Sequence, residues 1–392
     1  MKKVSLFRFY LVYALLSIFA NVAHPITPTL FTNIGYPDYM FGVSFAAMAF
    51  AIFLSSPFWG RVGDSIGHAK VIALTIPLYG LSQMWFGLSK TIFMTALSRF
   101  FCGFFSGGTA VATMAYVVNV TKQEERGRYM SYYAAVSSIF SAFGYFVGGV
   151  LGNKSIFMVF VLQTACSCVT GILSYLILDD AEKNKYAYST SSINPFKAFV
   201  DMKDIMTYSL VTFLVVVFLT SFATTAYDNA LNYYIKAALH LPSSYNGIIK
   251  SIIGIASLIV NFTINIYIVT KTDTKRSIII VLALCGISSM VVPFIHETMM
   301  FFAGNIIFFM FNAIYLPIQQ VIITKNQDAE ESGIISGVFN SIRAIGMIFG
   351  ALFAGFIYSY GNILPFIGAS IAFILSSVIS LVNFKQQIAS QK

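Results

Sequence analysis

Twelve apolar runs, each close to the length of a membrane-spanning helix, follow one another along this chain of 392 residues. A helix needs about 20 mostly apolar residues to cross roughly 30 Å of hydrocarbon. The runs occupy residues 7–33, 41–59, 71–88, 92–118, 128–151, 155–178, 207–235, 245–269, 277–295, 299–323, 333–358 and 363–384. A transmembrane barrel would instead show alternating segments of about ten residues. We therefore predict an all-α membrane protein with twelve transmembrane helices.

The composition excludes several other classes. Hydrophobic residues make up 57% of the chain and charged residues only 10%, with 39 Phe and 22 Tyr. A soluble domain is roughly one quarter charged, and its surface could not cover this much apolar area with polar groups. A soluble enzyme, a disordered protein and a nucleic-acid binder are thereby excluded. Since no Ser–His–Asp grouping, nucleotide-binding loop or metal-ligand spacing is found, we expect no enzymatic activity, cofactor or metal.

The positive charges predict the orientation of the chain. With the N-terminus inside, 18 of the 24 Lys and Arg residues fall in cytoplasmic segments and three in outer segments. This bias predicts that both termini are cytoplasmic. The net charge of +9 then reflects topology and anionic lipid head groups, without a nucleic-acid partner. Short loops and the lack of a sorting signal favour a bacterial plasma membrane, and we expect a monomer.

An internal repeat divides the chain into two halves. Residues 124–149, EERGRYMSYYAAVSSIFSAFGYFVGG, align with residues 330–355, EESGIISGVFNSIRAIGMIFGALFAG, at a constant offset of 206. Five identities fall in register: Glu124/Glu330, Glu125/Glu331, Gly127/Gly333, Gly144/Gly350 and Gly149/Gly355. The repeat predicts two pseudo-symmetric six-helix bundles, residues 1–180 and 207–392, joined by a cytoplasmic linker, 181–206, with a short amphipathic helix. Because the repeat needs the first apolar run, we interpret that run as a retained span and not as a cleaved signal peptide.

The sequence GRVGDSIGHAK at residues 60–70 follows the second run and carries a family resemblance. Gly60, Asp64 and Gly67, followed by basic residues, resemble the signature loop of the major facilitator superfamily. The motif Arg99-x-x-x-Gly103 in the fourth run is similar to the buried-arginine motif of the same family. The resemblance covers the whole chain and implies the major facilitator fold, in which two bundles expose a central site alternately to each side.

The fifth run points to one group within this family. Gly144-Tyr145-Phe146-Val147-Gly148-Gly149 stands where the twelve-helix drug:proton antiporters, the multidrug and tetracycline-type exporters, usually have Gly-Pro-x-x-Gly-Gly. We expect Gly144, Tyr145, Gly148 and Gly149 to form a helix-packing motif. Two departures are present: Tyr145 replaces the proline associated with antiport, and VTKTDTKR at 269–276 lacks the Gly–Asp–Gly spacing.

We expect Gly60, Arg61, Asp64, Gly67 and Lys70 to form a gate on the cytoplasmic side. The glycines permit a tight turn and close approach of helices, and the Asp64 carboxylate can accept hydrogen bonds from a helix N-terminus or from Arg61. A latch of this kind suits alternating access. The alternative is that Asp64 only caps the third span.

Charges inside the membrane are costly, so the few that are present form the list of proton-coupling candidates. Asp228 is the only one of the 15 acidic residues within a span, and Asn232 shares its helix face. The alternative for Asp228 is a permanent ion pair with Lys250. Arg99 could hold an anion, bias a carboxylate or lock helices together. His24, next to the helix-interrupting Pro25, could titrate or make a helix contact.

The polar residues within the membrane gather in the first, fourth, seventh and tenth spans. They supply the substrate-cavity candidates Asn21, His24, Arg99, Asp228, Asn229, Asn232, Asn305 and Asn312. The family resemblance implies that these four spans line the central cavity, whereas the third, sixth, ninth and twelfth spans face lipid.

Our first hypothesis is a secondary active transporter that exports a small lipophilic compound or drug in exchange for protons. Its partners would be the small-molecule substrate, protons and membrane lipids. A proton symporter or a uniporter of a small metabolite is the alternative that Tyr145 supports. A membrane scaffold or sensor that transports nothing is a third possibility.

Overall fold

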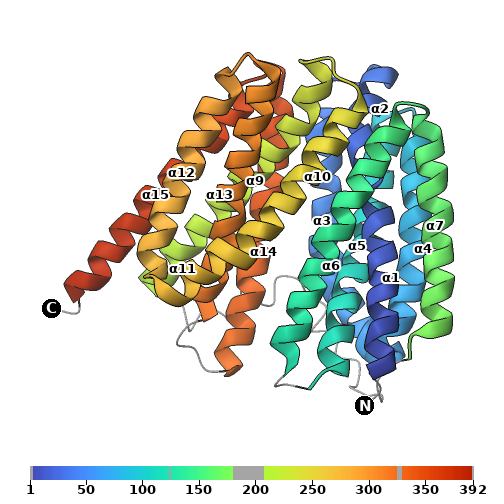
Figure 1. Ribbon diagram of the computed structural model, residues 1–392, viewed down its shortest axis with the longest axis horizontal. Coiled ribbons are helices and arrows are strands. Elements are labelled where there is room, and N and C mark those ends of the chain that lie inside the picture. The colour runs from blue at the N-terminus through green and yellow to red at the C-terminus, as the bar shows by residue number, and fades with distance from the viewer. Residues whose placement is uncertain (1–2, 123–124, 180–206, 325–328, 391–392) are drawn as a thin grey trace. The chain divides into compact units, whose positions relative to one another are not determined.

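The computed structural model describes residues 3–122, 125–179, 207–324 and 329–390, and within these ranges every regular element is a helix. Twelve spans of the described chain are long and apolar enough to cross a membrane (Figure 1). The predicted all-α architecture with twelve transmembrane helices is confirmed. Most of the predicted ends agree with the observed ends to within a few residues.

The first half of the chain supplies six of these spans. Its helices are α1 (Lys3–Asn21), α2 (Thr27–Ile34), α3 (Met40–Ile66), α4 (His68–Leu88), α5 (Ile92–Val120), α6 (Arg126–Gly152) and α7 (Ile156–Ile177). A 3₁₀ turn at His24–Ile26 separates α1 from α2, so the expected interruption of the first span at Pro25 is observed. Proline lacks the N–H group that a continuous α-helix would need at this point.

The second half supplies the other six spans. Its helices are α9 (Tyr208–Ala237), α10 (Ser243–Val260), α11 (Ile266–Lys271), α12 (Thr274–Val291), α13 (Thr298–Thr324), α14 (Ala329–Tyr358) and α15 (Leu364–Ser390). A π-helical turn at Asn261–Asn265 joins α10 to α11 within one span. The predicted amphipathic helix of the linker lies outside the described residues.

The predicted loop at residues 60–70 is wrong in its secondary structure. Helix α3 continues through Gly60 and Asp64 to Ile66, and α4 begins at His68. Gly67 alone lies between the two helices, with a φ of +104° that only glycine adopts readily. The charged residues of this segment mark the end of the apolar run but do not end the helix, because helices extend beyond the hydrocarbon into water.

Contacts within the chain group its residues into two compact units. Unit 1 comprises Met1–Tyr36, Ala47–Pro195 and Ile235–Ile255, and unit 2 comprises Pro37–Ala46, Phe196–Tyr234 and Ala256–Lys392. Each unit is thus built mainly from one predicted half and includes a short segment of the other. The division into bundles 1–180 and 207–392 around a linker stays a prediction.

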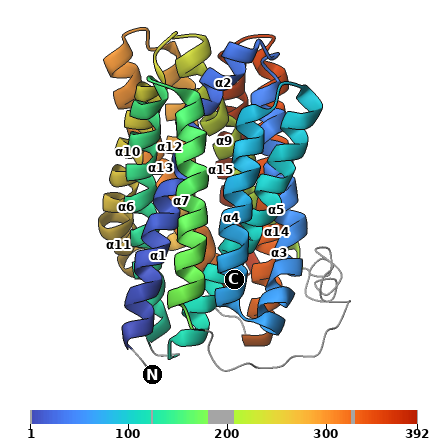
Figure 2. The ribbon, with the colours of Figure 1, turned by 90° about the vertical axis from the view of Figure 1, so that its right-hand side faces the viewer.

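Corresponding helices pack alike in the two units. In unit 1, α4 packs against α5 and α7, and these helices lie side by side in Figure 2. In unit 2, α12 packs against α13 and α15. The outer faces of α7 and α15 are apolar and exposed, with Phe157, Met158, Val169, Ile172, Leu176, Ile371, Leu375, Val378 and Val382. These faces suit lipid contact, as the family resemblance implies for the sixth and twelfth spans.

One pair of repeat-related glycines makes the same contact in each unit. A Cβ on Gly144 of α6 would collide with the carbonyl oxygen of Ile18 on α1. A Cβ on Gly350 of α14 would collide with the carbonyl oxygen of Phe222 on α9. Both glycines therefore let two helix backbones touch, as small residues do in membrane helix packing. The shared contact supports the duplication inferred from the sequence.

A second pair of repeat-related glycines behaves in the same way. In unit 1, a Cβ on Gly149 would lie 2.8 Å from the Cα of Gly247 on α10. In unit 2, a Cβ on Gly355 would lie 3.0 Å from the Cα of Gly42 on α3. Both distances are shorter than ordinary carbon contacts, so each crossing requires glycine on both helices.

Candidate functional site

Three helices of unit 1 each carry a row of polar side chains. Residues three or four apart lie on the same face of a helix, so each row points in one direction. The rows are Tyr13, Ser17 and Asn21 on α1; Ser106, Thr109 and Thr113 on α5; and Tyr133, Ser137 and Ser141 on α6. In otherwise apolar helices such rows need a polar environment to face.

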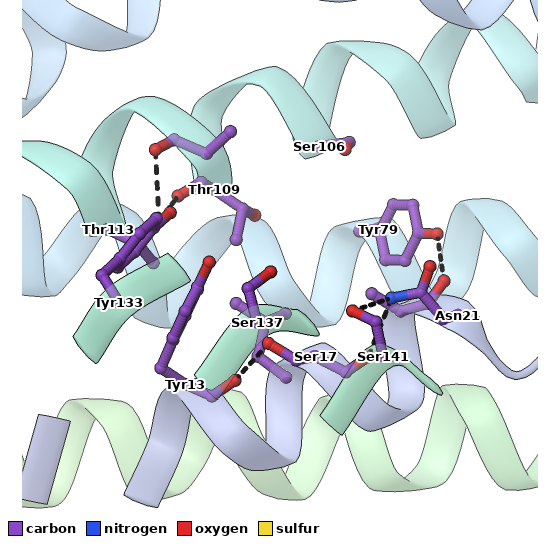
Figure 3. Close-up of a pocket in the computed structure, with 13 residues that line it drawn as sticks. Tyr13, Ser17, Asn21, Tyr79, Ser106, Thr109, Thr113, Tyr133, Ser137 and Ser141 are labelled. Carbon is purple, nitrogen blue, oxygen red and sulfur yellow. Dashed lines mark hydrogen bonds between the residues drawn. The ribbon is translucent and has the colours of Figure 1, made fainter. Parts of the chain in front are cut away.

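The three rows surround one cavity, to which α4 adds Tyr79 (Figure 3). Its volume is about 150 Å³, and its remaining lining residues are Leu16, Ala20 and Ala110. Every polar lining group is a hydroxyl except the Asn21 amide, so no lining side chain is charged at neutral pH. Ala110 is exposed, which leaves the cavity open on the side of α5.

Hydrogen bonds fix the polar walls of this cavity. The Ser17 hydroxyl donates to the Tyr13 carbonyl at 2.7 Å, and the Asn21 amide donates to Ser141 Oγ at 2.9 Å. Thr113 Oγ1 and the Tyr133 hydroxyl are hydrogen-bonded at 3.0 Å. These bonds tie α6 to α1 at one end of the cavity and to α5 at the other (Figure 3). The rings of Tyr13 and Tyr133 stack at 4.2 Å between centroids and complete a flat wall.

Arg99 is buried beside the cavity and does not line it. Its guanidinium donates to Thr27 Oγ1 at 3.1 Å and to Gln83 Oε1 at 3.4 Å, and it lies 3.5 Å above the centre of the Phe86 ring. Nε has no hydrogen-bond partner within the described residues. No carboxylate there lies within ion-pair distance of Arg99. A positive charge thus stays inside unit 1 with neutral hydrogen-bond acceptors only.

A chain of hydrogen bonds connects Arg99 to the cavity wall. Because Gln83 Oε1 accepts from Arg99, the Gln83 amide is oriented so that Nε2 donates to the Tyr79 hydroxyl at 2.7 Å. The Tyr79 hydroxyl in turn donates to the Ala20 carbonyl at 3.0 Å. Arg99 is therefore linked to Tyr79 in the cavity wall through the Gln83 amide.

Unit 2 has a polar seam between α9 and α13, formed by amide side chains seven residues apart on α13. The hydrogen bonds are Tyr227 hydroxyl to Asn305 Oδ1 at 2.9 Å, Asn312 Nδ2 to Thr224 Oγ1 at 2.8 Å, and Gln319 Nε2 to Thr220 Oγ1 at 3.1 Å. Asn305 and Gln319 are fully buried. The predicted cavity residues Asn305 and Asn312 thus make helix–helix hydrogen bonds, and their cavity role stays a prediction.

The remaining predicted site residues are distributed over both units. Asp228, Asn229 and Asn232 lie half-buried on α9, where the Asn229 amide donates to the Thr225 carbonyl of its own helix at 3.0 Å. The His24 ring lies 6.0 Å from the Tyr145 ring in unit 1. Since Asp228 belongs to unit 2, and Lys250 to unit 1, the proposed pairing of these two stays a prediction.

The residues of the predicted gate meet at the junction of α3 and α4. Asp64 Oδ1 lies 3.5 Å from Nε2 of His68, which is the first residue of α4. This contact is with the His68 side chain, and within the described residues no side chain caps the N-terminus of α4 through a hydrogen bond. Arg61 is half-buried and Lys70 is exposed. Gating by this group is still a prediction.

Of the eight predicted cavity residues, Asn21 lines the cavity of unit 1. The hydroxyl residues that form most of its wall were not predicted from the sequence. The sequence pattern that could have identified them is a four-residue spacing of polar residues. It is present in Tyr13, Ser17 and Asn21 on α1 and again in Tyr133, Ser137 and Ser141 on α6.

Twelve helices of the described chain can span a membrane, they pack as repeats, and unit 1 contains a polar cavity, which together are typical of a membrane transport protein. The family model described as Major Facilitator Superfamily matches residues 9–351 and 213–388, so the chain belongs to this superfamily. The predicted family is confirmed, and membership makes the chain a multi-pass membrane transporter that would bind a small-molecule substrate, not an enzyme.

Two relatives resemble the chain over most of its length. Multidrug resistance protein 2 of Bacillus subtilis (strain 168) is 23% identical over 362 residues, which cover 91% of this chain and 90% of the relative. Tetracycline resistance protein, class H, of Pasteurella multocida is 21% identical over 345 residues, covering 86% and 84%. The solved structure of the nucleoside transporter NupG matches with a TM-score of 0.73 at 15% identity, covering 98% of this chain and 100% of the other, and shows the shared fold.

Proposed function

We propose that this transporter exports small lipophilic compounds from the cell in exchange for protons, by alternating access. The observation that carries the proposal is the near full-length similarity to relatives named for multidrug and tetracycline resistance. The packing of repeat-related glycines in both units supports a duplicated architecture, which is a recurrent feature of transporters that work by alternating access.

The coupling residues of this proposal are Asp228, Arg99 and His24. Asp228 is an acidic residue in the middle part of α9, and a carboxylate within a span can bind and release a proton as its surroundings alternate between water and protein. Arg99 keeps its charge at all relevant pH values and therefore acts as a fixed charge. Its hydrogen bonds reach the cavity through Gln83 and Tyr79.

The orientation of the transporter in the membrane is inferred from the distribution of positive charges. We place both termini in the cytoplasm, since cytoplasmic segments hold 18 of the 24 Lys and Arg residues. We also place the chain in a bacterial plasma membrane, as a monomer in contact with lipids through its apolar outer faces.

Transport into liposomes tests the proposal. Purified protein is reconstituted with an acidic lumen and supplied outside with ethidium, tetracycline or 4-methylumbelliferyl β-D-glucoside. Exchange for protons predicts that at least one probe accumulates several-fold more than without the gradient, and that nigericin abolishes the accumulation. Ethidium is a permanent cation, so trapping by pH alone cannot concentrate it. Equal uptake of every probe with and without the gradient contradicts proton coupling.

The variant Asp228→Asn tests the titrating residue, with Asp273→Asn as its matched control. Asp273 caps α12 outside the spans by accepting from the Lys275 amide at 3.0 Å, a bond that asparagine can also make. We expect Asp228→Asn to abolish gradient-driven uptake and Asp273→Asn to retain it. Unchanged coupling in Asp228→Asn rules out the proton role and favours the pairing with Lys250.

The symporter or uniporter alternative rests on Tyr145, which replaces the proline associated with antiport. In the same assay a uniporter only equilibrates the probe, and a symporter accumulates it when the gradient is reversed. Absence of transport for every probe, in either direction, would favour a scaffold or sensor.

A further inference from the structure

The cavity of unit 1 is too small for a whole drug-sized molecule. Sites for such ligands have volumes of about 300–1,000 Å³, whereas this cavity measures about 150 Å³. A cavity of roughly that size accommodates one benzene ring. The cavity can therefore receive a single six-membered ring that belongs to a larger substrate.

The lack of charged side chains in the cavity wall excludes two classes of substrate group, cationic and anionic. A cationic ring would call for a carboxylate to replace its lost hydration, and none lines the cavity. An anionic group would call for a cationic donor, but Arg99 is engaged with Thr27 and Gln83 and contacts the cavity only through Tyr79. The group that enters is therefore uncharged.

The hydrogen-bonding pattern favours hydroxyl groups. Ser17 uses its hydroxyl proton on the Tyr13 carbonyl, so its oxygen is left as an acceptor in the cavity wall, whereas the Tyr79 hydroxyl both donates to Ala20 and accepts from Gln83. Figure 3 draws no hydrogen bond from Ser106 Oγ to the other residues of the cavity wall, so its proton is available as a donor. A hydroxyl both donates and accepts, and so matches a wall that offers both functions. An apolar ring would desolvate the Ser106 hydroxyl without giving it a hydrogen bond.

The wall also has apolar surface where the plane of a ring can rest. Leu16, Ala20 and Ala110 interrupt the hydroxyl rows, and the stacked rings of Tyr13 and Tyr133 lie beside them. Figure 3 shows the polar side chains of α1, α5 and α6 arranged around the same space. A ring with hydroxyl groups on its edge and apolar faces fits such a mixed lining.

We propose that this cavity binds an uncharged six-membered ring carrying hydroxyl groups, a sugar-like or polyhydroxylated aromatic part of the exported compound. The inference rests on the proposed export function and narrows its substrate class. The Asn21–Ser141 and Thr113–Tyr133 bonds hold the cavity walls, and Ser106 and Ser137 recognise the ring.

Binding to the purified protein in detergent, measured by calorimetry without any gradient, tests the inference. The probe is 4-methylumbelliferyl β-D-glucoside, and the comparison ligand is its tetra-O-methyl derivative, which has the same ring without donors. We expect the methylated ligand to bind at least about tenfold more weakly. Ser106→Ala and Ser137→Ala should each weaken glucoside binding about fivefold, as expected for one lost hydrogen bond between uncharged groups. The control is Ser288→Ala, because within the described residues this hydroxyl bonds only to carbonyls of its own helix in unit 2.

Equal affinity for the two ligands, or unchanged glucoside affinity in both cavity variants, overturns the inference. The comparison of ligands uses the unaltered protein, so it holds even if a variant fails to fold. A failure of this inference can be distinguished from a failure of the proposed export function. Gradient-driven uptake of ethidium without glucoside binding contradicts the hydroxylated-ring site and leaves the export function standing. Glucoside binding without gradient-driven uptake of any probe contradicts proton-coupled export and leaves the hydroxylated-ring site standing.

Discussion

The substitution Arg99→Met distinguishes a coupling role from a structural lock, because the two roles predict different changes in stability. The favourable contacts of Arg99 are a hydrogen bond to Thr27, a long one to Gln83 and a cation–π contact with Phe86. From typical values these contribute about 4–6 kcal/mol. Against them stand several kcal/mol for desolvating a buried ion and about 1–3 kcal/mol for the unpaired Nε.

These opposing terms nearly cancel, so we expect Arg99→Met to change the free energy of unfolding by no more than about 2 kcal/mol. Thr27 keeps its bond to the Ala23 carbonyl, and only Gln83 Oε1 loses its partner. The double variant Arg99→Met/Gln83→Leu removes that unpaired oxygen and should be at least as stable as the single variant. Gradient-driven transport should be lost in both.

The assay is the apparent Tm in detergent, measured alongside liposome uptake. Arg276→Met serves as the control for loss of a cation, since Arg276 is largely exposed. A loss of more than about 3 kcal/mol in Arg99→Met, not relieved in the double variant, would show that Arg99 locks the helices and would refute the reasoning.

Three further predictions concern the packing, a cap and the gate. Gly149→Ala places a Cβ 2.8 Å from the Gly247 Cα and should cost about 1–3 kcal/mol of stability, measured as a lower apparent Tm. Gly60→Ala should not lower the apparent Tm, because its Cβ would lie 3.6 Å from the nearest atom, an ordinary contact distance. Hydrogen bonds from the Met299 and Met300 amides lower the pKa of Glu297 below its ordinary 4.5. Glu297→Gln should therefore lower the apparent Tm at neutral pH, with a difference that disappears as acid protonates the wild-type carboxylate. Asp64→Asn should slow uptake at least about tenfold with probe affinity unchanged; uptake at the wild-type rate would contradict gating.

The twelve spans could be predicted because the length and apolarity of a membrane helix are local properties of the sequence. The prediction erred at the end of the second span, where Arg61 and Asp64 end the apolar run although the helix continues to Ile66. Hydropathy measures where the hydrocarbon ends, whereas the helix ends where Gly67 reverses the chain.

The candidate site could be predicted only in part. Asn21 was found because an amide within a span is conspicuous, but Ser17 and Ser137 were missed because single hydroxyls are common in membrane helices and usually bond to their own backbone. The cavity role predicted for Asn305 and Asn312 stays a prediction, and the structure adds that both are hydrogen-bonded to α9. Hydropathy does not show which helix packs against a given amide side chain, because that is decided by tertiary contacts.

Proton movement driven by substrate tests the central claim most directly. Liposomes with a voltage clamp and a luminal pH dye are loaded with each of the three probes in turn and diluted into probe-free buffer. Exchange predicts that the lumen becomes acidic as at least one probe leaves, and that Asp228→Asn abolishes the change. Alkalinisation of the lumen, or efflux of a probe through the protein with no change in pH, would contradict proton-coupled export.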